Sequence, residues 1–181
     1  MATRSFIRTI AALGALLVCG LLCTGTAGAT TLVLPDGTVG PQPYQTWVDR
    51  AAVPTVPGVV TLRLDGCQDL PGCVPAGARE IALSPDWANA HVLLHELGHL
   101  FDDEMPDWAR TQFQAFTGPR AWLADPSTNP PSEQFAEAYS LCARRRVIRQ
   151  RTFAAYRWAP TPAAHLRACS IIRRAGGWPA R

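Results

Sequence analysis

The residues with the clearest chemical meaning are two histidines and a glutamate in the segment HELGH, which spans His95 to His99. Residues four apart on an α-helix share one face, so His95 and His99 can direct both imidazoles at one metal ion. Glu96 lies on the flank of that face, where it can reach a water on the metal without binding the metal. A catalytic zinc ion usually takes three protein ligands. The segment therefore predicts half of a zinc site.

The third ligand has to come from another element. One class of zinc peptidases has a glycine and a third histidine after HExxH, at positions that hold Asp102 and Met105 here. Asp102 and Asp103 lie on the same helix or at its end, where we expect local turn groups or outer contacts. SEQFAEA offers Glu133 and Glu137, again four apart and so on one face of a later helix. Either carboxylate could complete the site, and the other could be a solvated group.

The two motifs together resemble the gluzincin class of zinc peptidases, in which a glutamate on a downstream helix follows HExxH. The closest likeness is to the anthrax lethal factor-like catalytic domain, where HExGHxxD precedes ExFAEA. This chain has HELGHLFD and EQFAEA, and the likeness covers about residues 79 to 145. The resemblance implies that His95, His99 and Glu133 bind one zinc ion. It also implies that Glu96 is the general base and that Glu137 fixes the tautomer of a ligand histidine.

Two further parts of such a site concern the substrate. In such folds the edge strand ahead of the metal helix binds extended peptide by strand addition, and residues 79–84 (REIALS) hold that place. The related enzymes also supply a tyrosine or histidine that stabilises the tetrahedral oxyanion. The loop ahead of Glu133 contains Trp122 but no tyrosine. The candidates that remain are Tyr139, Tyr156 and His165.

The elements that must position these side chains follow from hydrophobic periodicity and end signals. Ser84 and Pro85 are typical of a helix start, as capping residue and first helical residue. Two strands that flank a cysteine loop indicate a hairpin or small antiparallel sheet. The prediction is an α+β fold: a small, mostly helical zincin-like domain with a short antiparallel sheet preceding the HExxH helix. We expect helices at 44–52, 85–101, 106–118, 132–147 and 151–175, and strands at 59–65 and 79–84.

The N-terminal segment has the pattern of a secretory signal peptide, residues 1–29. Arg4 and Arg8 precede an apolar run, and small residues follow up to Ala29, the expected cleavage site. An uncleaved anchor is the alternative, but the run is shorter than the roughly 20 residues that a spanning helix needs. We expect an extended leader at 30–43, which could cover the cleft as a pro-peptide, and a metallopeptidase domain at 44–181. The protein is then secreted or held in the cell envelope, without a stable membrane span.

Four cysteines follow the expected cleavage site: Cys67, Cys73, Cys142 and Cys169. An even number in an exported protein indicates two disulfides, for which three connectivities exist. We favour Cys67–Cys73, which closes the loop CQDLPGC, together with Cys142–Cys169, because each cysteine then pairs with its nearest mate. A cysteine zinc site is disfavoured, since CxxC spacing is absent.

Charge is distributed unevenly along the chain. Residues 30–137 hold all 14 acidic residues, whereas 138–181 hold ten arginines and no acid. The cluster RRRVIRQR could indicate nucleic acid or an anionic polymer as a partner. Aromatic residues do not interleave with it, so we expect a solvated face and no nucleic-acid partner.

These residues predict an exported zinc metalloendopeptidase that cleaves peptide or protein substrates with a zinc-activated water and Glu96 as general base. Two alternatives stay open: a catalytically inactive, zinc-stabilised cell-surface binding protein, and a cell-wall amide hydrolase. His91 lies four residues before His95. We expect it on the helix surface or in an outer contact, and not as a ligand.

Overall fold

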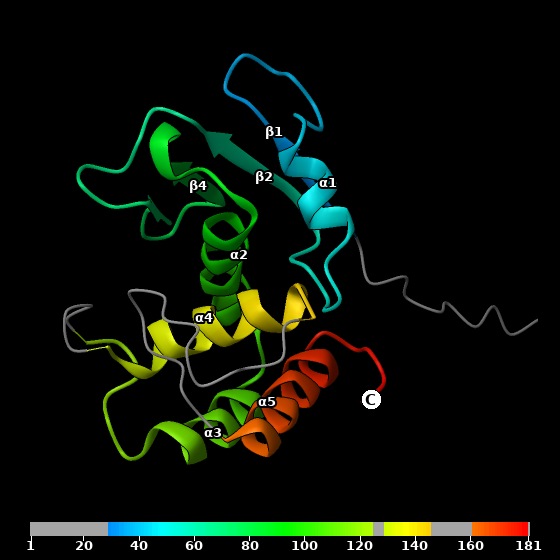
Figure 1. The fold of residues 1–181 in the computed structure, drawn as a ribbon, viewed down its shortest axis with the longest axis vertical. Coiled ribbons are helices and arrows are strands. Elements are labelled where there is room, and N and C mark those ends of the chain that lie inside the picture. The colour runs from blue at the N-terminus through cyan, green and yellow to red at the C-terminus, as the bar shows by residue number, and fades with distance from the viewer. Residues whose placement is uncertain (1–28, 125–128, 146–160, 181) are drawn as a thin grey trace, which may run out of the picture.

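The computed structural model describes residues 29–124, 129–145 and 161–180, which form an α+β fold with more helix than strand (Figure 1). A small sheet lies at one end, α2 runs from it toward the centre, and α4 crosses α2. α3 and α5 lie beyond α4. The elements are β1 (Thr30–Val33), α1 (Tyr44–Asp49), β2 (Gly58–Arg63), β3 (Gly72–Cys73), β4 (Glu80–Leu83), the 3₁₀ turn η1 (Pro85–Trp87), α2 (Ala90–Glu104), α3 (Asp107–Thr117), α4 (Pro131–Ala143) and α5 (Pro162–Ala175).

The sheet is mixed, with the strand order β1-β2-β4-β3. β2 runs parallel to both β1 and β4, and only β3 is antiparallel to its neighbour β4. The predicted antiparallel sheet and hairpin are therefore wrong. The segment between Arg63 and Glu80 exceeds the dozen or so residues that a parallel connection needs, and it also carries β3. β4 pairs on both sides, so REIALS is not the edge strand that the sequence suggested.

Residues 30–43, expected as an extended leader, begin with β1. Thr30 pairs in register with Gly58 of β2, and Leu32 is fully buried in the core. β1 completes one edge of the sheet, and turns follow between Val33 and the start of α1. Residues 1–28, most of the expected signal peptide, lie outside the described residues. Within the described part, none of the helices has both the length and the apolar character needed to cross a membrane.

The helix that carries HELGH begins later than predicted. Ser84 makes no capping hydrogen bond, and Pro85 opens η1 instead. Asn89 is the cap of α2, because its side-chain oxygen accepts the backbone N–H groups of His91 and Val92 at 2.8 and 3.2 Å. A side chain at the true N-terminus satisfies N–H groups that the helix itself leaves free.

The later helices follow the predictions more closely. α3 ends where Gly118, at φ 79°, turns the chain out of the helix. α4 ends at Ala143, before the predicted end at Val147. Within the predicted helical region 151–175, the structure describes α5, which the side chain of Thr161 caps. Residues 146–160 lie outside the described residues.

A continuous apolar core joins the sheet to the helices. Leu93 and Leu97 of α2 are fully buried. Phe113 of α3 packs edge-on against Phe135 of α4, with ring centroids 5.1 Å apart. Both predicted disulfides are present: Cys67–Cys73 beside β3, and Cys142–Cys169, which links α4 to α5.

Candidate metal centre

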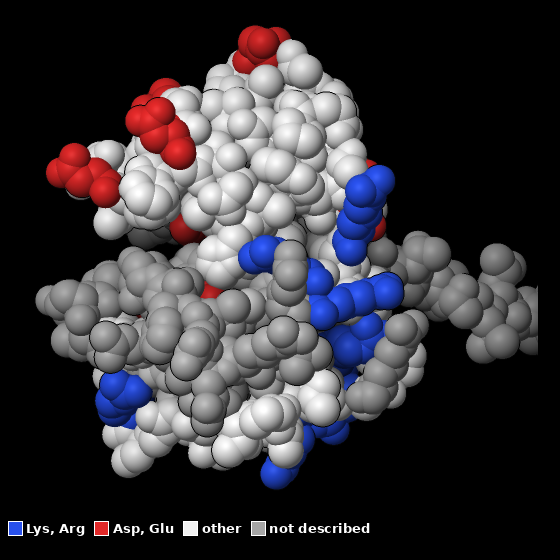
Figure 2. Space-filling view, viewed as in Figure 1, with Lys and Arg blue, Asp and Glu red and all other residues white. Residues whose placement is uncertain are grey.

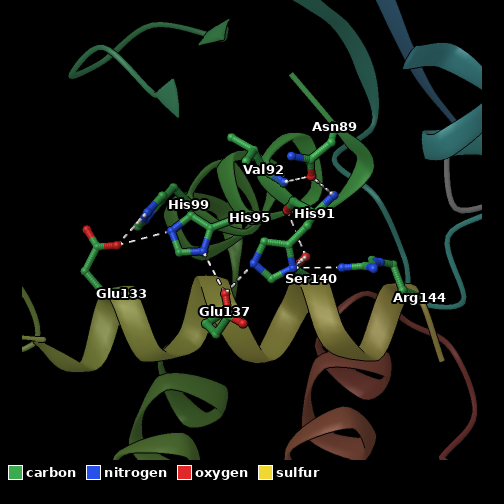
Figure 3. A network of polar contacts seen from close by, with 9 residues as sticks. All are labelled: Asn89, His91, Val92, His95, His99, Glu133, Glu137, Ser140 and Arg144. Carbon is green, nitrogen blue, oxygen red and sulfur yellow. Dashed lines mark hydrogen bonds and ion pairs between the residues drawn. The ribbon is translucent and has the colours of Figure 1, made fainter. Parts of the chain in front are cut away.

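The predicted ligand residues meet where α2 crosses α4 (Figure 3). The Nε2 atoms of His95 and His99 lie 3.2 and 3.4 Å from the same oxygen, Oε2 of Glu133. One potential ligand atom from each residue lies within 4.8 Å of the other two. Two imidazole nitrogens and one carboxylate oxygen are the donor set of many catalytic zinc sites, so the group could hold a metal ion.

Gly98 makes this close crossing possible. A Cβ atom at Gly98 would lie 2.8 Å from Cα of Ala136 and 3.1 Å from Cβ of Tyr139, which is too close for a side chain. Helix backbones approach most closely where one of them carries no side chain. The glycine of HELGH and the first alanine of FAEA therefore set the distance between the histidines and the glutamate. The spacing of the metal ligands alone did not reveal this role.

The three groups are electrostatically complementary without a metal. Burial opposes protonation of His95, but its contacts with Glu133 and Glu137 outweigh burial and raise its pKa to about 9. Burial alone would raise the pKa of Glu133, but the imidazoles of His95 and His99 lower it to about 2. The raised pKa favours a protonated His95 in the absence of a metal, and the lowered pKa keeps the carboxylate of Glu133 ionised, as a ligand must be.

Glu96 lies beside the ligands and is buried. Burial raises the pKa of its carboxyl group, although the neighbouring imidazoles of His95 and His99 act in the opposite direction. A raised pKa suits a carboxylate that has to accept a proton near neutral pH. A Cβ atom at Gly72 of β3 would lie 2.9 Å from Oε1 of Glu96, so the strand backbone lies directly against this carboxylate.

A cleft of about 440 Å³ opens over the candidate ligands and Glu96. One lip comes from the cysteine loop and β3, and the other comes from the segment that precedes α4. Leu70 and Leu123, both exposed, line the cleft, one from each of these two segments. The residues that line the cleft are Leu70, Gly72, Cys73, Val74, Pro75, Ala76, Gly77, His95, Glu96, His99, Asp102, Asp103, Leu123, Ala124, Ser132 and Glu133. None of them belongs to residues 30–43.

Glu137 lies on the side of His95 that faces away from the cleft. Its Oε2 atom is 3.5 Å from Nδ1 of His95 and 3.0 Å from Nε2 of His91. Both imidazoles are at ion-pair distance but out of line for a good hydrogen bond, and Oε2 has no well-aligned partner among the described residues. Burial raises the pKa of Glu137, and the two histidines more than offset it, so the pKa is lowered. The carboxylate is buried and not solvated.

Asp102 organises the second lip. Its carboxylate is buried and accepts hydrogen bonds from Nη2 of Arg110 at 3.0 Å and from Nε1 of Trp122 at 2.6 Å. Burial raises its pKa, which these two donors only partly offset. Trp122 directly precedes Leu123, so Asp102 anchors this lip to the end of α2. The sequence suggested a local or outer contact for Asp102 but did not reveal these two partners.

Two of the oxyanion candidates lie elsewhere. The hydroxyl of Tyr139 is fully buried and donates to the backbone oxygen of Pro54 at 2.7 Å. His165 packs on α5 with its Nε2 atom 3.5 Å from Sγ of Cys169. Neither side chain lines the cleft, so both are wrong as candidates for the oxyanion donor. Tyr139 is packed in the core, and His165 lies against the second disulfide. Tyr156 lies outside the described residues.

Comparisons with known proteins identify no relative of this chain. No protein-family model matches the chain, and neither a curated protein nor a solved structure matches it.

Proposed function

We propose that this chain is an exported zinc-dependent metallopeptidase with a zincin-like domain of the gluzincin type. One observation carries the proposal: His95, His99 and Glu133 converge at the floor of an open cleft, with donor atoms within 4.8 Å of one another. A site that only stabilised the fold would be expected to close around its metal with protein ligands. Three ligands below a cleft leave room for water and substrate.

The side chains divide the work of hydrolysis among them. Bound zinc would supply Lewis acidity that polarises a scissile carbonyl and acidifies a water. Glu96 accepts the proton of the attacking water and passes it to the leaving amine. Its burial and the backbone of Gly72 confine the carboxylate to one position, which a positioned base requires.

β3 and the residues after it are the best candidates for the substrate-binding edge. β3 is the terminal strand of the sheet, and residues 72–77 line the cleft. An extended peptide can add its backbone to such an edge. The exposed Leu70 and Leu123 on the two lips favour apolar side chains near the scissile bond. Two disulfides are consistent with an extracellular site of action.

Turnover of a peptide library by the zinc-loaded protein tests the proposal. Glu96→Gln should lower kcat/KM by about 100-fold or more, since a positioned general base contributes about 10²–10⁴. Zinc content should not change, because Glu96 is not a proposed ligand. Glu104→Gln is a matched control on an exposed part of α2 and should keep full activity.

Three results separate the alternatives. Activity that survives Glu96→Gln would sink the mechanism. Bound zinc without turnover of any peptide would support a binding protein. Cleavage of a defined cell-wall cross-link, with linear peptides untouched, would support an amide hydrolase.

A further inference from the structure

A chain of polar contacts continues outward from the candidate metal centre (Figure 3). Glu137 lies between His95 and His91, and Nδ1 of His91 lies 2.8 Å from Nη1 of Arg144. The chain therefore runs from a proposed ligand through a carboxylate and a second histidine to an arginine. His91 and Arg144 have no place in the mechanism described above.

The partners of His91 determine which of its two ring nitrogens carries the proton. A guanidinium group only donates hydrogen bonds, so Nδ1 of His91 accepts from Arg144. The proton of the ring then sits on Nε2, which faces Oε2 of Glu137 at 3.0 Å. The carboxylate of Glu137 can only accept, and it lies nearest Nε2 of His91 and Nδ1 of His95, although neither contact is a well-aligned hydrogen bond. Glu137 therefore favours a proton on Nδ1 of His95, which directs Nε2 of His95 toward the metal position.

The backbone of His91 is held as firmly as its ring. The side chain of Asn89 accepts its N–H at 2.8 Å, and the buried hydroxyl of Ser140 donates to its carbonyl at 2.9 Å. These contacts tie the first turn of α2 to α4. A histidine merely exposed on a helix surface would direct its ring nitrogens to water, whereas both nitrogens of His91 face protein groups.

We propose that His91 and Arg144 are positioning residues of the metal centre, an inference that rests on the proposed zinc site. Arg144 selects the tautomer of His91, His91 orients the carboxylate of Glu137, and Glu137 orients the ligand His95. Outer partners of this kind typically contribute 10- to 100-fold to metal affinity.

The test measures the zinc dissociation constant by competition with a chromophoric chelator. We expect His91→Phe to weaken zinc binding by about 10- to 100-fold, because the ring shape stays but the donor to Glu137 is lost. His91→Gln should restore affinity to within about 3-fold, since its amide nitrogen can reach the position of Nε2. Arg144→Gln should weaken binding, whereas the matched control Arg145→Gln, at the exposed neighbouring position, should leave it unchanged.

Two further measurements separate positioning from a general loss of structure. Thermal unfolding of the zinc-free variants should match that of the wild-type chain. The visible absorption bands of bound cobalt(II), which report ligand geometry, should change in His91→Phe and return in His91→Gln.

Each outcome has one meaning. Wild-type zinc affinity in His91→Phe would overturn the inference while leaving the zinc site intact, as would equal weakening by Arg144→Gln and Arg145→Gln. A wild-type chain that binds no zinc would remove the proposed function as well. If His91→Phe does not fold, Arg144→Gln decides, and an unchanged affinity and cobalt spectrum would refute the role of the arginine.

Discussion

At the scale of single residues, the polar groups of the site depend on a neighbour that has no side chain. Gly72 brings the backbone of β3 against Glu96, the residue that the mechanism needs in one fixed place. A base within hydrogen-bond reach of a water loses most of its effect when it moves by about 1 Å. The glycine is thus as much a part of the site's geometry as the carboxylate that it touches.

Gly72→Ala should lower kcat by about 10- to 100-fold while zinc affinity stays within about 3-fold of wild type. The new Cβ atom would lie 2.9 Å from Oε1 and 3.0 Å from Cγ of Glu96, so the carboxylate has to move. It would also lie 3.0 Å from Cδ2 of Leu83, and none of these three nearest atoms belongs to a proposed metal ligand. Steady-state kinetics and zinc competition on the same preparation measure both effects.

A double-mutant cycle isolates the contact between Gly72 and Glu96. In a Glu96→Ala background the two contacted atoms of Glu96 are gone, whereas the contact with Cδ2 of Leu83 at 3.0 Å remains. Gly72→Ala should therefore lose the part of its effect on the free energy of unfolding that comes from Glu96. An effect of equal size in both backgrounds would show that the strand, and not the carboxylate, is disturbed.

At the scale of elements, the site is a product of one helix crossing. α2 supplies two candidate ligands and the proposed base, α4 supplies the third candidate ligand and Glu137, and Gly98 lets the two backbones approach. The contact at Gly98 is with the backbone of Ala136, which cannot rotate away as a side chain can. The separation of the ligands is therefore set by packing before any metal binds.

Gly98→Ala should reduce the free energy of unfolding and weaken zinc binding. Overpacking costs about 1–3 kcal/mol, which exceeds the gain of about 1 kcal/mol from the better helix propensity of alanine. Chemical denaturation and zinc competition measure the two effects. Adding Ala136→Gly should not restore either, because the clash is with Cα and the carbonyl oxygen. Glu104→Ala, exposed on the same helix and outside the cleft, is the control, and equal losses in both variants would contradict the packing argument.

The sequence predicted most of the helices and the convergence of three candidate ligand side chains. This succeeded because a spacing of four residues places side chains on one face of any helix, whatever the tertiary structure. The disulfide pairing was predicted because each cysteine has a near mate in sequence. The spacing alone could not decide whether Glu133 or Glu137 completes the site, but their contacts in the structure do distinguish them. Glu133 lies against both His95 and His99, whereas Glu137 lies against His95 and not His99.

The incorrect predictions share a physical cause, which is that each depended on contacts between distant segments. Whether β2 and β4 pair parallel or antiparallel depends on how β1 and β3 join the sheet, and the local residue pattern of a strand does not determine this. Ser84 has the residue type of a cap, but α2 begins five residues later, where the side chain of Asn89 makes the capping hydrogen bonds. Tyr139 has the chemistry of an oxyanion donor, and its hydroxyl is engaged by the distant Pro54.

At the scale of the whole molecule, charged side chains are unevenly distributed over the surface. On the face shown in Figure 2, acidic side chains stand out at the sheet end, and most arginines lie lower, over and beside the helices.

The candidate metal centre and one disulfide join segments that are far apart in sequence. The candidate metal centre links α2 to α4, and Cys142–Cys169 links α4 to α5. A bound metal and the second disulfide together would therefore connect three helices in series.

Removal of the metal should therefore lower the stability of the whole domain. Zinc at 100 times its dissociation constant adds about 2.7 kcal/mol to the free energy of unfolding. For a domain of this size that corresponds to a rise in Tm of roughly 5–10 °C. Thermal unfolding with excess zinc and with a chelator measures the difference, with the disulfides left intact.

Glu133→Gln supplies the control for this experiment, because it keeps the shape of the side chain but removes the charge that binds the metal. Its Tm should respond little to zinc or chelator, while its cooperative transition shows that the fold persists. Equal zinc-dependent shifts in Glu133→Gln and in the wild-type chain would place the stabilising metal elsewhere. Identical melts of the wild-type chain with zinc and with chelator would mean that the crossing of α2 and α4 holds no zinc under those conditions, and the linkage between metal and fold would fail.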